Sequence, residues 1–233
     1  MTPNICIYTI RKFFSIIKIL VKHANCHELR RIEASDGYRS IHGDVSARIM
    51  PVSHGSSNHG PYISSAFFIR HDTKMQEFLF FGDVEPDGIS LTPQTIDVWR
   101  TAAPMIPDKL KAIFIECSWP SGRANNQLYG HLSPEHFAQE MENLANEVVR
   151  SRNGEVTSEL TSHDDGPRGA KRIWSSKNIL RGLRVYVIHC KEDWSSTSLR
   201  PMHEVILNEV KALVGKKELG VEILHARQGS IIR

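Results

Sequence analysis

The sequence has 233 residues, of which 40% are hydrophobic and 24% are charged, with a formal net charge of +3. These values are ordinary for a globular protein, and the length suits one large domain or two small ones. The mild positive excess forms no dense Lys/Arg stripe, so composition gives no support to nucleic-acid binding.

Residues 1–46 differ from the rest of the chain in their pattern of apolar and charged residues. The apolar residues between Ile5 and Val21 are interrupted by three Lys or Arg side chains, so no run approaches the ~18 apolar residues of a membrane span. Their helical spacing predicts an amphipathic helix followed by a loop. No signal peptide is predicted either. The four scattered cysteines are typical of reduced side chains, so we expect a cytoplasmic protein without a membrane segment.

From residue 47 onward, short apolar runs alternate with helical patterns. Predicted strands cover 48–52, 66–69, 78–81, 111–117, 183–188 and 220–224, and predicted helices cover 90–103, 133–148 and 201–213. Residues from about 150 to 178 hold few apolar positions and are predicted to be a mobile surface insertion. The alternation in the C-terminal half predicts an α/β fold in which helices cover a sheet.

Metal-ligating residue types follow several of the predicted strands. His54, Asp83 and His189 each come directly after an apolar run, and Glu116 and His131 occupy similar positions. Each of these histidines alone is more often a capping or surface residue. Together, imidazoles and carboxylates at one edge of a sheet form the nitrogen and oxygen ligand set that suits zinc.

Six segments in this order resemble the class II cyclic-nucleotide phosphodiesterases, the fungal low-affinity type within the metallo-β-lactamase superfamily. The resemblance covers about residues 47–230. The segments are Pro51–Gly55, Tyr62–Ile69, Phe81–Asp87, Ile115–Ser118, Leu128–Leu132 and Val187–Glu192.

This resemblance implies an αββα sandwich with two zinc ions at one edge of the paired sheets. It also implies hydrolysis of the 3′ ester of cyclic AMP to give 5′-AMP. By the same resemblance, His54 is a ligand of the first zinc, Asp83 bridges both ions, and His189 is a ligand of the second. A shared carboxylate agrees with two-metal chemistry, in which both ions act on one reacting group.

Three further residues are candidates for roles around the metals. His131 is predicted either to give a proton to the leaving 3′ oxygen or to contact the phosphate, which with Asp83 completes the catalytic candidates. A buried histidine bonded to Glu116 is the alternative for His131. Glu116 or Glu85 could orient a ligand histidine from behind.

The superfamily's principal motif, His-x-His-x-Asp-His, does not occur in this chain. The chain therefore resembles the C-terminal part of such an enzyme, residues 47–233, behind an N-terminal segment, 1–46, that is unlike the family. The sandwich is expected to be incomplete on its N-terminal side. With only three of the usual ligands, we expect weak zinc binding and impaired activity.

Two other functions fit the pattern. A metallo-β-lactamase-type nuclease that processes tRNA 3′ ends would need a basic RNA-binding arm, which the sequence lacks. A non-catalytic scaffold would keep half of the sandwich and leave strand edges open to self-association. The expected partner is a cyclic-nucleotide substrate, without nucleic acid or membrane.

Overall fold

The computed structural model describes residues 5–9, 17–21, 34, 37–159, 173–192 and 200–226. The strands are β1 (Ile5–Thr9), β2 (Ile17–Val21), β3 (Arg39–His42), β4 (Val45–Ser57), β5 (Gly60–His71), β6 (Gln76–Phe81), β7 (Leu110–Glu116), β8 (Arg184–Ile188) and β9 (Glu222–His225). The helices are α1 (Thr95–Ala102), α2 (Pro134–Glu159) and α3 (Met202–Gly215), with short 3₁₀ turns at Ala103–Met105 and Asn125–Gln127.

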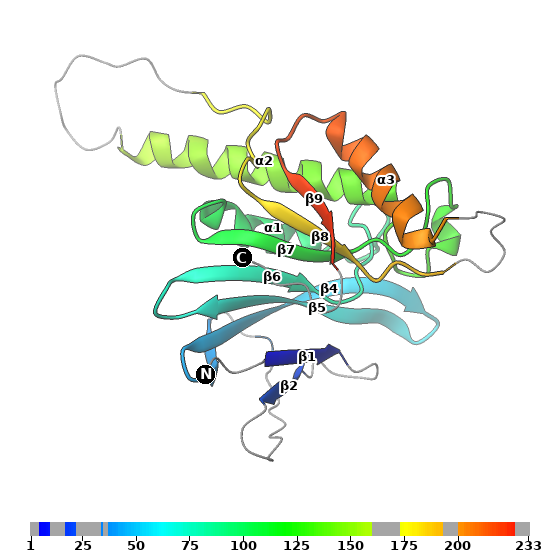
Figure 1. Cartoon of the computed structure of the whole chain (residues 1–233), viewed down its shortest axis with the longest axis horizontal. Helices are drawn as coiled ribbons and strands as arrows, with labels where there is room; N and C mark the ends of the chain where they lie inside the picture. Colours follow the sequence, from blue (N-terminus) through cyan, green and yellow to red (C-terminus); the bar gives the residue numbers. More distant parts are fainter. Residues whose placement is uncertain are drawn as a thin grey trace.

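The strands β3 to β9 form one seven-stranded sheet in chain order (Figure 1). The first four pair antiparallel, whereas β6, β7, β8 and β9 pair parallel. Because two antiparallel steps separate β4 from β6, these two strands point the same way. The C-terminal ends of β4, β6, β7 and β8 therefore lie at one edge of the sheet, toward the right in Figure 1.

The helices cover one face of this sheet and bury its main core (Figure 1). Phe81 of β6 packs against Trp99 of α1, with ring centroids 5.1 Å apart, and Phe68 and Phe137 are fully buried in the same cluster. Each large apolar side chain buried in this way contributes about 1.5–3 kcal/mol. The predicted α/β class is confirmed, and the core fixes the end of β6 against the helices.

The opposite face of the sheet is also apolar. Phe67 points to this face while its neighbour Phe68 points to the helices, as the alternation of a strand requires. On β7 and β8 the rings of Phe114 and Tyr186 are stacked with centroids 4.8 Å apart. Apolar side chains on both faces are typical of a sheet that lies between two layers.

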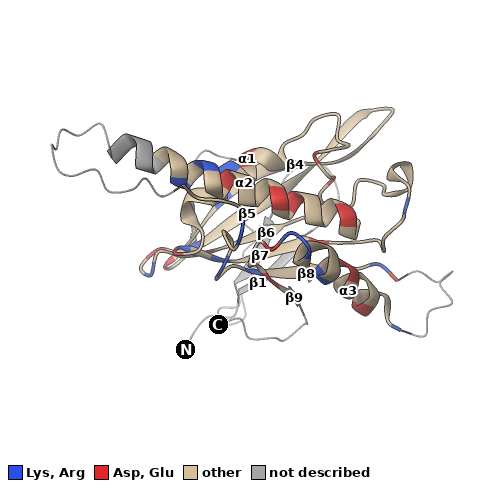
Figure 2. Cartoon of the chain, turned by 90° about the horizontal axis from the view of Figure 1, so that it is seen from above, with Lys and Arg blue, Asp and Glu red and all other residues tan. Residues whose placement is uncertain are grey.

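The outer surface of the helical layer carries charges of both signs (Figure 2). Glu147 of α2 lies between Arg100 and Arg150, with N–O distances of 3.8 and 3.4 Å. Lys217, just after α3, places its Nζ 2.6 Å from a carboxylate oxygen of Glu142. Such pairs near the surface contribute about 0–1 kcal/mol each, so packing of the apolar core holds this layer.

The N-terminal helix predicted across residues 5–21 is wrong. Ile5–Thr9 and Ile17–Val21 form an antiparallel pair of strands, with Ile5 opposite Val21. Both segments are rich in Ile, Val and Thr, whose branched side chains favour extended backbone. Short apolar runs of this kind fit a helical and a strand period equally well. Residues 10–16 lie outside the described residues.

The first part of the surface insertion predicted from about residue 150 to 178 is helical in the structure. Helix α2 continues to Glu159, so the prediction is wrong for residues 150–159. Asn153 bonds the backbone of Trp174, accepting from its N–H at 3.1 Å, and Arg152 lies over the Trp174 ring at 4.6 Å. Ser151, Asn153 and Gly154 are weak helix formers, so these contacts with Trp174, and not helix propensity, support the extension. Residues 160–172 lie outside the described residues.

Helix α1 begins later than the sequence predicts, because a distant carboxylate caps it. Asp87, in the loop after β6, accepts hydrogen bonds from the backbone N–H groups of Gln94, Thr95 and Ile96 at 2.7–3.1 Å. An anion at the free N–H groups of a helix start is stabilising. The cap also ties the loop that follows β6 to the helical layer.

Glu140 of α2 holds the same loop from the other side. Its buried carboxylate accepts hydrogen bonds from Trp99 Nε1 at 2.8 Å and from the Asp87 backbone N–H at 3.1 Å. Burial raises the pKa of Glu140. We expect Glu140→Ala to lower the free energy of unfolding by about 2–4 kcal/mol, because both donors lose their acceptor. Urea denaturation measures this loss.

The matched control is Glu142→Ala on the same helix. This change removes a partly exposed ion pair with Lys217, so it should cost less than about 1 kcal/mol. If both variants lost similar amounts of unfolding free energy, the bonds from Glu140 to Trp99 and to the loop after β6 would contribute nothing to stability.

Candidate metal centre

Three of the predicted site residues meet at the C-terminal edge of the sheet. His54 lies near the end of β4, Asp83 lies two residues after β6, and His189 directly follows β8. The Nε2 atom of His54 is 3.6 Å from Asp83 Oδ2, and the Nε2 atom of His189 is 3.4 Å from Asp83 Oδ1. Each oxygen of one carboxylate therefore faces a different histidine. The three side chains are partly exposed, so the cluster is open to solvent.

His54 is aimed by a bulge in its strand. The register of β4 against β5 shifts between Ser53 and Ser56, and β-bulges commonly redirect a side chain beside a site. Nδ1 of His54 is 2.8 Å from the carbonyl oxygen of Gly130. Because a carbonyl oxygen only accepts hydrogen bonds, Nδ1 carries a proton, which leaves Nε2, on the side of Asp83, as the ring nitrogen that can bind a metal ion. This is the tautomer that a metal ligand needs.

A glycine makes this contact with His54 possible. Gly130 has φ +78°, and a Cβ added to it would lie 2.6 Å from the carbonyl carbon and oxygen of His54. Only glycine fits such a close approach between two backbones. Gly55 packs against Gly130 from the other side with φ +76°. The sequence contains both glycines in its recognisable segments, but it does not reveal that they touch.

His189 is held by its backbone. It has φ +57°, an uncommon conformation for a residue other than glycine, of a kind that clusters at functional sites. The Lys191 N–H donates to the carbonyl oxygen of Ser118 at 3.0 Å, and the Cys117 N–H donates to the carbonyl oxygen of Ile188 at 3.1 Å. These bonds fasten the turn after β8 to the end of β7.

Behind this cluster lies a buried network centred on Glu116. Its carboxylate accepts from His131 Nδ1 at 2.7 Å, from the Val84 N–H at 2.9 Å and from the Ser118 hydroxyl at 2.5 Å. Val84 follows Asp83, so Glu116 also fixes the chain that carries the bridging candidate. The alternative considered for His131, a buried histidine bonded to Glu116, is the arrangement in the structure.

His131 lies close to both candidate ligands but uses both of its ring nitrogens elsewhere. Its ring centroid is 4.8 Å from that of His54 and 5.5 Å from that of His189. Donor atoms of His54, Asp83 and His131 lie within 4.8 Å of one another, which by distance alone is a possible metal group. However, Nδ1 of His131 faces Glu116 and Nε2 is 2.7 Å from Lys191 Nζ. We therefore take His189, not His131, as the third donor.

The donor set of His54, Asp83 and His189 fits a metal pair. Two imidazole nitrogens and a carboxylate are the ligand types of zinc. The fixed tautomer of His54 and the two-sided position of Asp83 are what such a site requires. The remaining candidate, Glu85, reaches the site through its backbone, since its N–H donates to the carbonyl oxygen of Ser53 at 2.7 Å.

A family model described as cAMP phosphodiesterases class-II matches residues 1–229. The chain belongs to this family. The match takes in residues 1–46, which we expected to lie outside the resemblance. The family predicted from the six sequence segments is confirmed.

Relatives of known function or structure agree with the family match. A 3′,5′-cyclic-nucleotide phosphodiesterase of Candida albicans is 29% identical over 204 residues, which cover 83% of this chain and 43% of the relative. One of Schizosaccharomyces pombe is 40% identical over 105 residues, 45% of this chain and 30% of the relative. The crystal structure of unliganded yeast PDE1 is 26% identical with a TM-score of 0.65, covering 86% of this chain and 49% of that one. The chain thus spans less than half the length of the relatives it matches.

Two cysteines of this member of the class-II family lie beside the site but are poor ligands. Cys117 follows Glu116 and is fully buried, and Cys190 follows His189. Burial raises the pKa of the Cys117 thiol well above its usual value, and it raises the pKa of Cys190 to about 12. Only a thiolate binds metal well, so these thiols act as small core residues.

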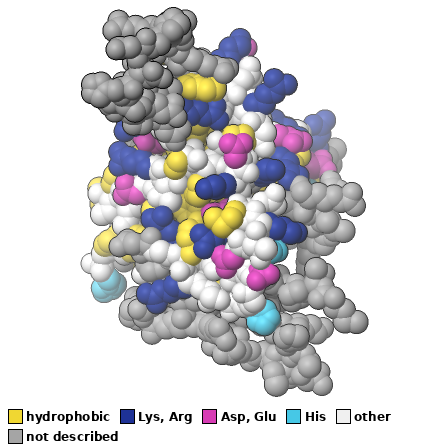
Figure 3. Space-filling model, turned by 90° about the vertical axis from the view of Figure 1, so that its left-hand side faces the viewer, with side chains coloured by type: hydrophobic (Ala, Val, Ile, Leu, Met, Phe, Trp, Pro, Cys, Tyr) yellow, Lys and Arg dark blue, Asp and Glu magenta, His cyan; other side chains and the backbone are white. Residues whose placement is uncertain are grey.

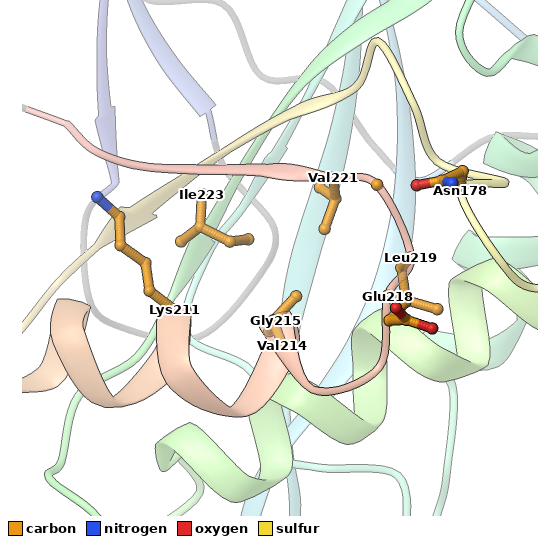
Figure 4. A pocket seen from close by; sticks show the side chains of 9 residues that line it. Asn178, Lys211, Val214, Gly215, Glu218, Leu219, Val221 and Ile223 are labelled. Carbon is orange, nitrogen blue, oxygen red and sulfur yellow. The ribbon is translucent and has the colours of Figure 1, made fainter.

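A separate cavity of about 460 Å³ lies away from the metal centre (Figure 4). It is bounded by the C-terminal part of α3 and the segment that enters β9, and Val214, Val221 and Ile223 line it. The start of β9 pairs with the start of β8, so this cavity is at the other end of β8 from His189. Its lining offers no group of metal ligands among the described residues.

The surface away from the site has no single charge character. Figure 3 faces the left-hand end of the molecule in Figure 1, and the visible Lys and Arg side chains there are scattered among neutral ones. In the part of the chain that the structure describes, no helix is both long enough and apolar enough to cross a bilayer.

Proposed function

We propose that this chain hydrolyses the 3′ ester of 3′,5′-cyclic AMP to 5′-AMP at a two-zinc site. His54 and His189 would each provide one imidazole nitrogen, and Asp83 would be the carboxylate that the two ions share. The cytoplasm is the proposed compartment, because the substrate is an intracellular nucleotide.

The position of Asp83 between two histidines is the observation that carries this proposal. Its two oxygens lie 3.4 and 3.6 Å from Nε2 atoms that come from different strands. Two imidazole nitrogens and both oxygens of one carboxylate therefore face the same partly exposed space. With two metal ions about 3.5–4 Å apart, a shared carboxylate is the expected ligand.

The chain's own groups have separate tasks in this reaction. Bound zinc ions would polarise the phosphoryl group and activate a water molecule. His54 is oriented by the carbonyl oxygen of Gly130, and the turn that carries His189 is held by the bond from the Lys191 N–H to the carbonyl oxygen of Ser118. Glu116 keeps its carboxylate on the Val84 N–H and so holds Asp83 in place. Such fixed positioning is how a site stabilises charge that develops during a reaction.

The ligand set of this chain predicts a weak site. The chain has no His-x-His-x-Asp-His segment. Three side chains shared by two ions give each ion about two protein ligands, fewer than the three that a catalytic zinc normally keeps. Calorimetric titration with zinc is expected to give weak binding without two tight sites. Two tight sites would contradict the incomplete ligand set.

The reaction itself is tested at zinc concentrations that load the site. Chromatography should detect slow conversion of cyclic AMP to 5′-AMP, because the bond to the 3′ oxygen breaks. Release of 3′-AMP would overturn the proposed bond, and absence of any product at saturating zinc would overturn the reaction for this chain.

A further inference from the structure

Lys191 lies against His131, the residue that the sequence predicted to contact the phosphate. Its Nζ atom is 2.7 Å from His131 Nε2, and it lies 4.8 Å from the centre of the Trp119 ring. The residue is two positions after His189, in the turn that follows β8. Its ammonium group therefore belongs to the same small cluster as the candidate ligands.

His131 itself is badly placed to meet a substrate. Only 3% of its surface is exposed, and both ring nitrogens are engaged, one with Glu116 and the other with Lys191. A hydrogen bond from the ammonium to Nε2 requires Nε2 to carry the lone pair, so His131 is neutral with its proton on Nδ1. Nε2 of His131 therefore has no proton to donate to a phosphoryl oxygen, and Lys191 covers it.

From this geometry we infer that Lys191 is a substrate-binding residue whose ammonium contacts a phosphoryl oxygen of the nucleotide. The inference rests on the proposed function and adds a named contact to it. An ammonium group has three donors in tetrahedral arrangement, so a bond to His131 is compatible with a second to an anionic oxygen. Charge-assisted hydrogen bonds of this kind are stronger than neutral ones.

Three contacts hold Lys191 in position before a substrate arrives, two at its ammonium group and one at its backbone. The first is the acceptor on His131, which Glu116 orients from behind. The second is the face of Trp119, whose indole N–H donates to the carbonyl oxygen of Leu128 at 2.9 Å. The third is the backbone N–H of Lys191 itself, which donates to the Ser118 carbonyl oxygen. A lysine fixed in this way loses little side-chain entropy when it binds a phosphate.

A second cation supports an anionic ligand at this edge. The Arg123 guanidinium lies over the Trp119 ring at 3.7 Å, and its Nε donates to the Gln127 carbonyl oxygen at 2.8 Å. Trp119 thus has both Lys191 and Arg123 against its ring. Lys191 and Arg123 thus place two positive charges near one ring. Bound metal ions would neutralise the charge of Asp83, so the site favours a ligand that carries negative charge.

The test compares two ligands that differ only by the phosphate. Binding of 5′-AMP and of adenosine to the full chain is measured by calorimetry or NMR titration, with and without zinc. Lys191→Met keeps most of the side-chain length and removes the charge. It is expected to weaken 5′-AMP binding by about tenfold or more, and to leave adenosine binding unchanged.

The control variant is Lys111→Met, an exposed lysine at the start of β7, the opposite end of that strand from Glu116. It should bind both ligands like the wild type, and Lys191→Arg should recover part of the 5′-AMP affinity.

Equal 5′-AMP affinity in Lys191→Met and wild type overturns the inference and leaves the proposed reaction intact. A parallel loss of adenosine binding also overturns it, because that loss reports disturbed packing around Trp119. By contrast, a wild-type chain that binds 5′-AMP through Lys191 but never hydrolyses cyclic AMP would refute the reaction alone.

Discussion

Asp83→Asn is expected to abolish both zinc binding and hydrolysis of cyclic AMP while the chain stays folded. An asparagine side chain is neutral and has one oxygen, so it cannot face both His54 and His189 with an acceptor. Loss of the shared ligand leaves each proposed zinc with a single histidine. We expect turnover to fall by more than about 100-fold, since the ions provide the main charge stabilisation.

Zinc calorimetry and product chromatography measure this loss, and thermal unfolding checks the fold. Asp108→Asn is the matched control, because Asp108 is exposed in the loop before β7. It should bind zinc and turn over cyclic AMP like the wild type. If Asp83→Asn kept the affinity for zinc, the bridging role would be refuted and the metal would have to bind elsewhere.

Among glycine-to-alanine substitutions near the site, Gly130→Ala is expected to lower the free energy of unfolding the most. The new Cβ would lie 2.6 Å from backbone atoms of His54 and 2.8 Å from the backbone nitrogen of Gly55. Backbone atoms cannot rotate away as a flexible side chain would. We expect the free energy of unfolding to fall by about 3 kcal/mol or more, from overlap added to the strain of a positive φ.

Gly122→Ala separates the cost of steric overlap from the cost of backbone strain at a positive φ. Gly122 has φ +81°, nearly the same as Gly130, but an added Cβ meets nothing within 4 Å. Its variant should lose about 1–2 kcal/mol from backbone strain alone. Urea denaturation of both variants gives the difference, and zinc titration of Gly130→Ala should report a displaced His54. Equal losses for the two alanines would show that the close approach to His54 has no energetic cost.

Much of the sheet could be predicted because its strands are strongly apolar and end in polar residues. The segments that lead to Asp83, Glu116 and His189 are buried strands, and a parallel sheet brings their C-terminal ends to one edge. Because these strands are parallel, their common direction alone predicts that the three residues lie at the same edge. The N-terminal strands were missed because short apolar runs carry no clear period, and α2 was predicted too short because residues 150–159 contain a single apolar side chain, Val156.

The contacts that decide the role of each side chain were not predictable from spacing. His131 and Lys191 are 60 residues apart, and their bond depends on how the turn after β8 meets the loop before α2. The pairing of Gly55 with Gly130 and the cap that Asp87 gives to α1 are likewise long-range. A lone lysine two residues after a histidine carries no signal of its own, so Lys191 was not among the candidates.

The bulge at His54 also has a consequence for how this protein can change over time. Beyond it, β4 and β5 continue as a projecting tip, in which Ser57 pairs with Gly60. Adding or removing residues in matched pairs at that tip preserves the parity of the ladder, so the imidazole keeps its orientation. A single-residue deletion between Ser53 and Ser56 would instead remove the irregularity and turn the histidine to another direction. Natural length variation among related chains should therefore be tolerated in the tip and avoided at the bulge.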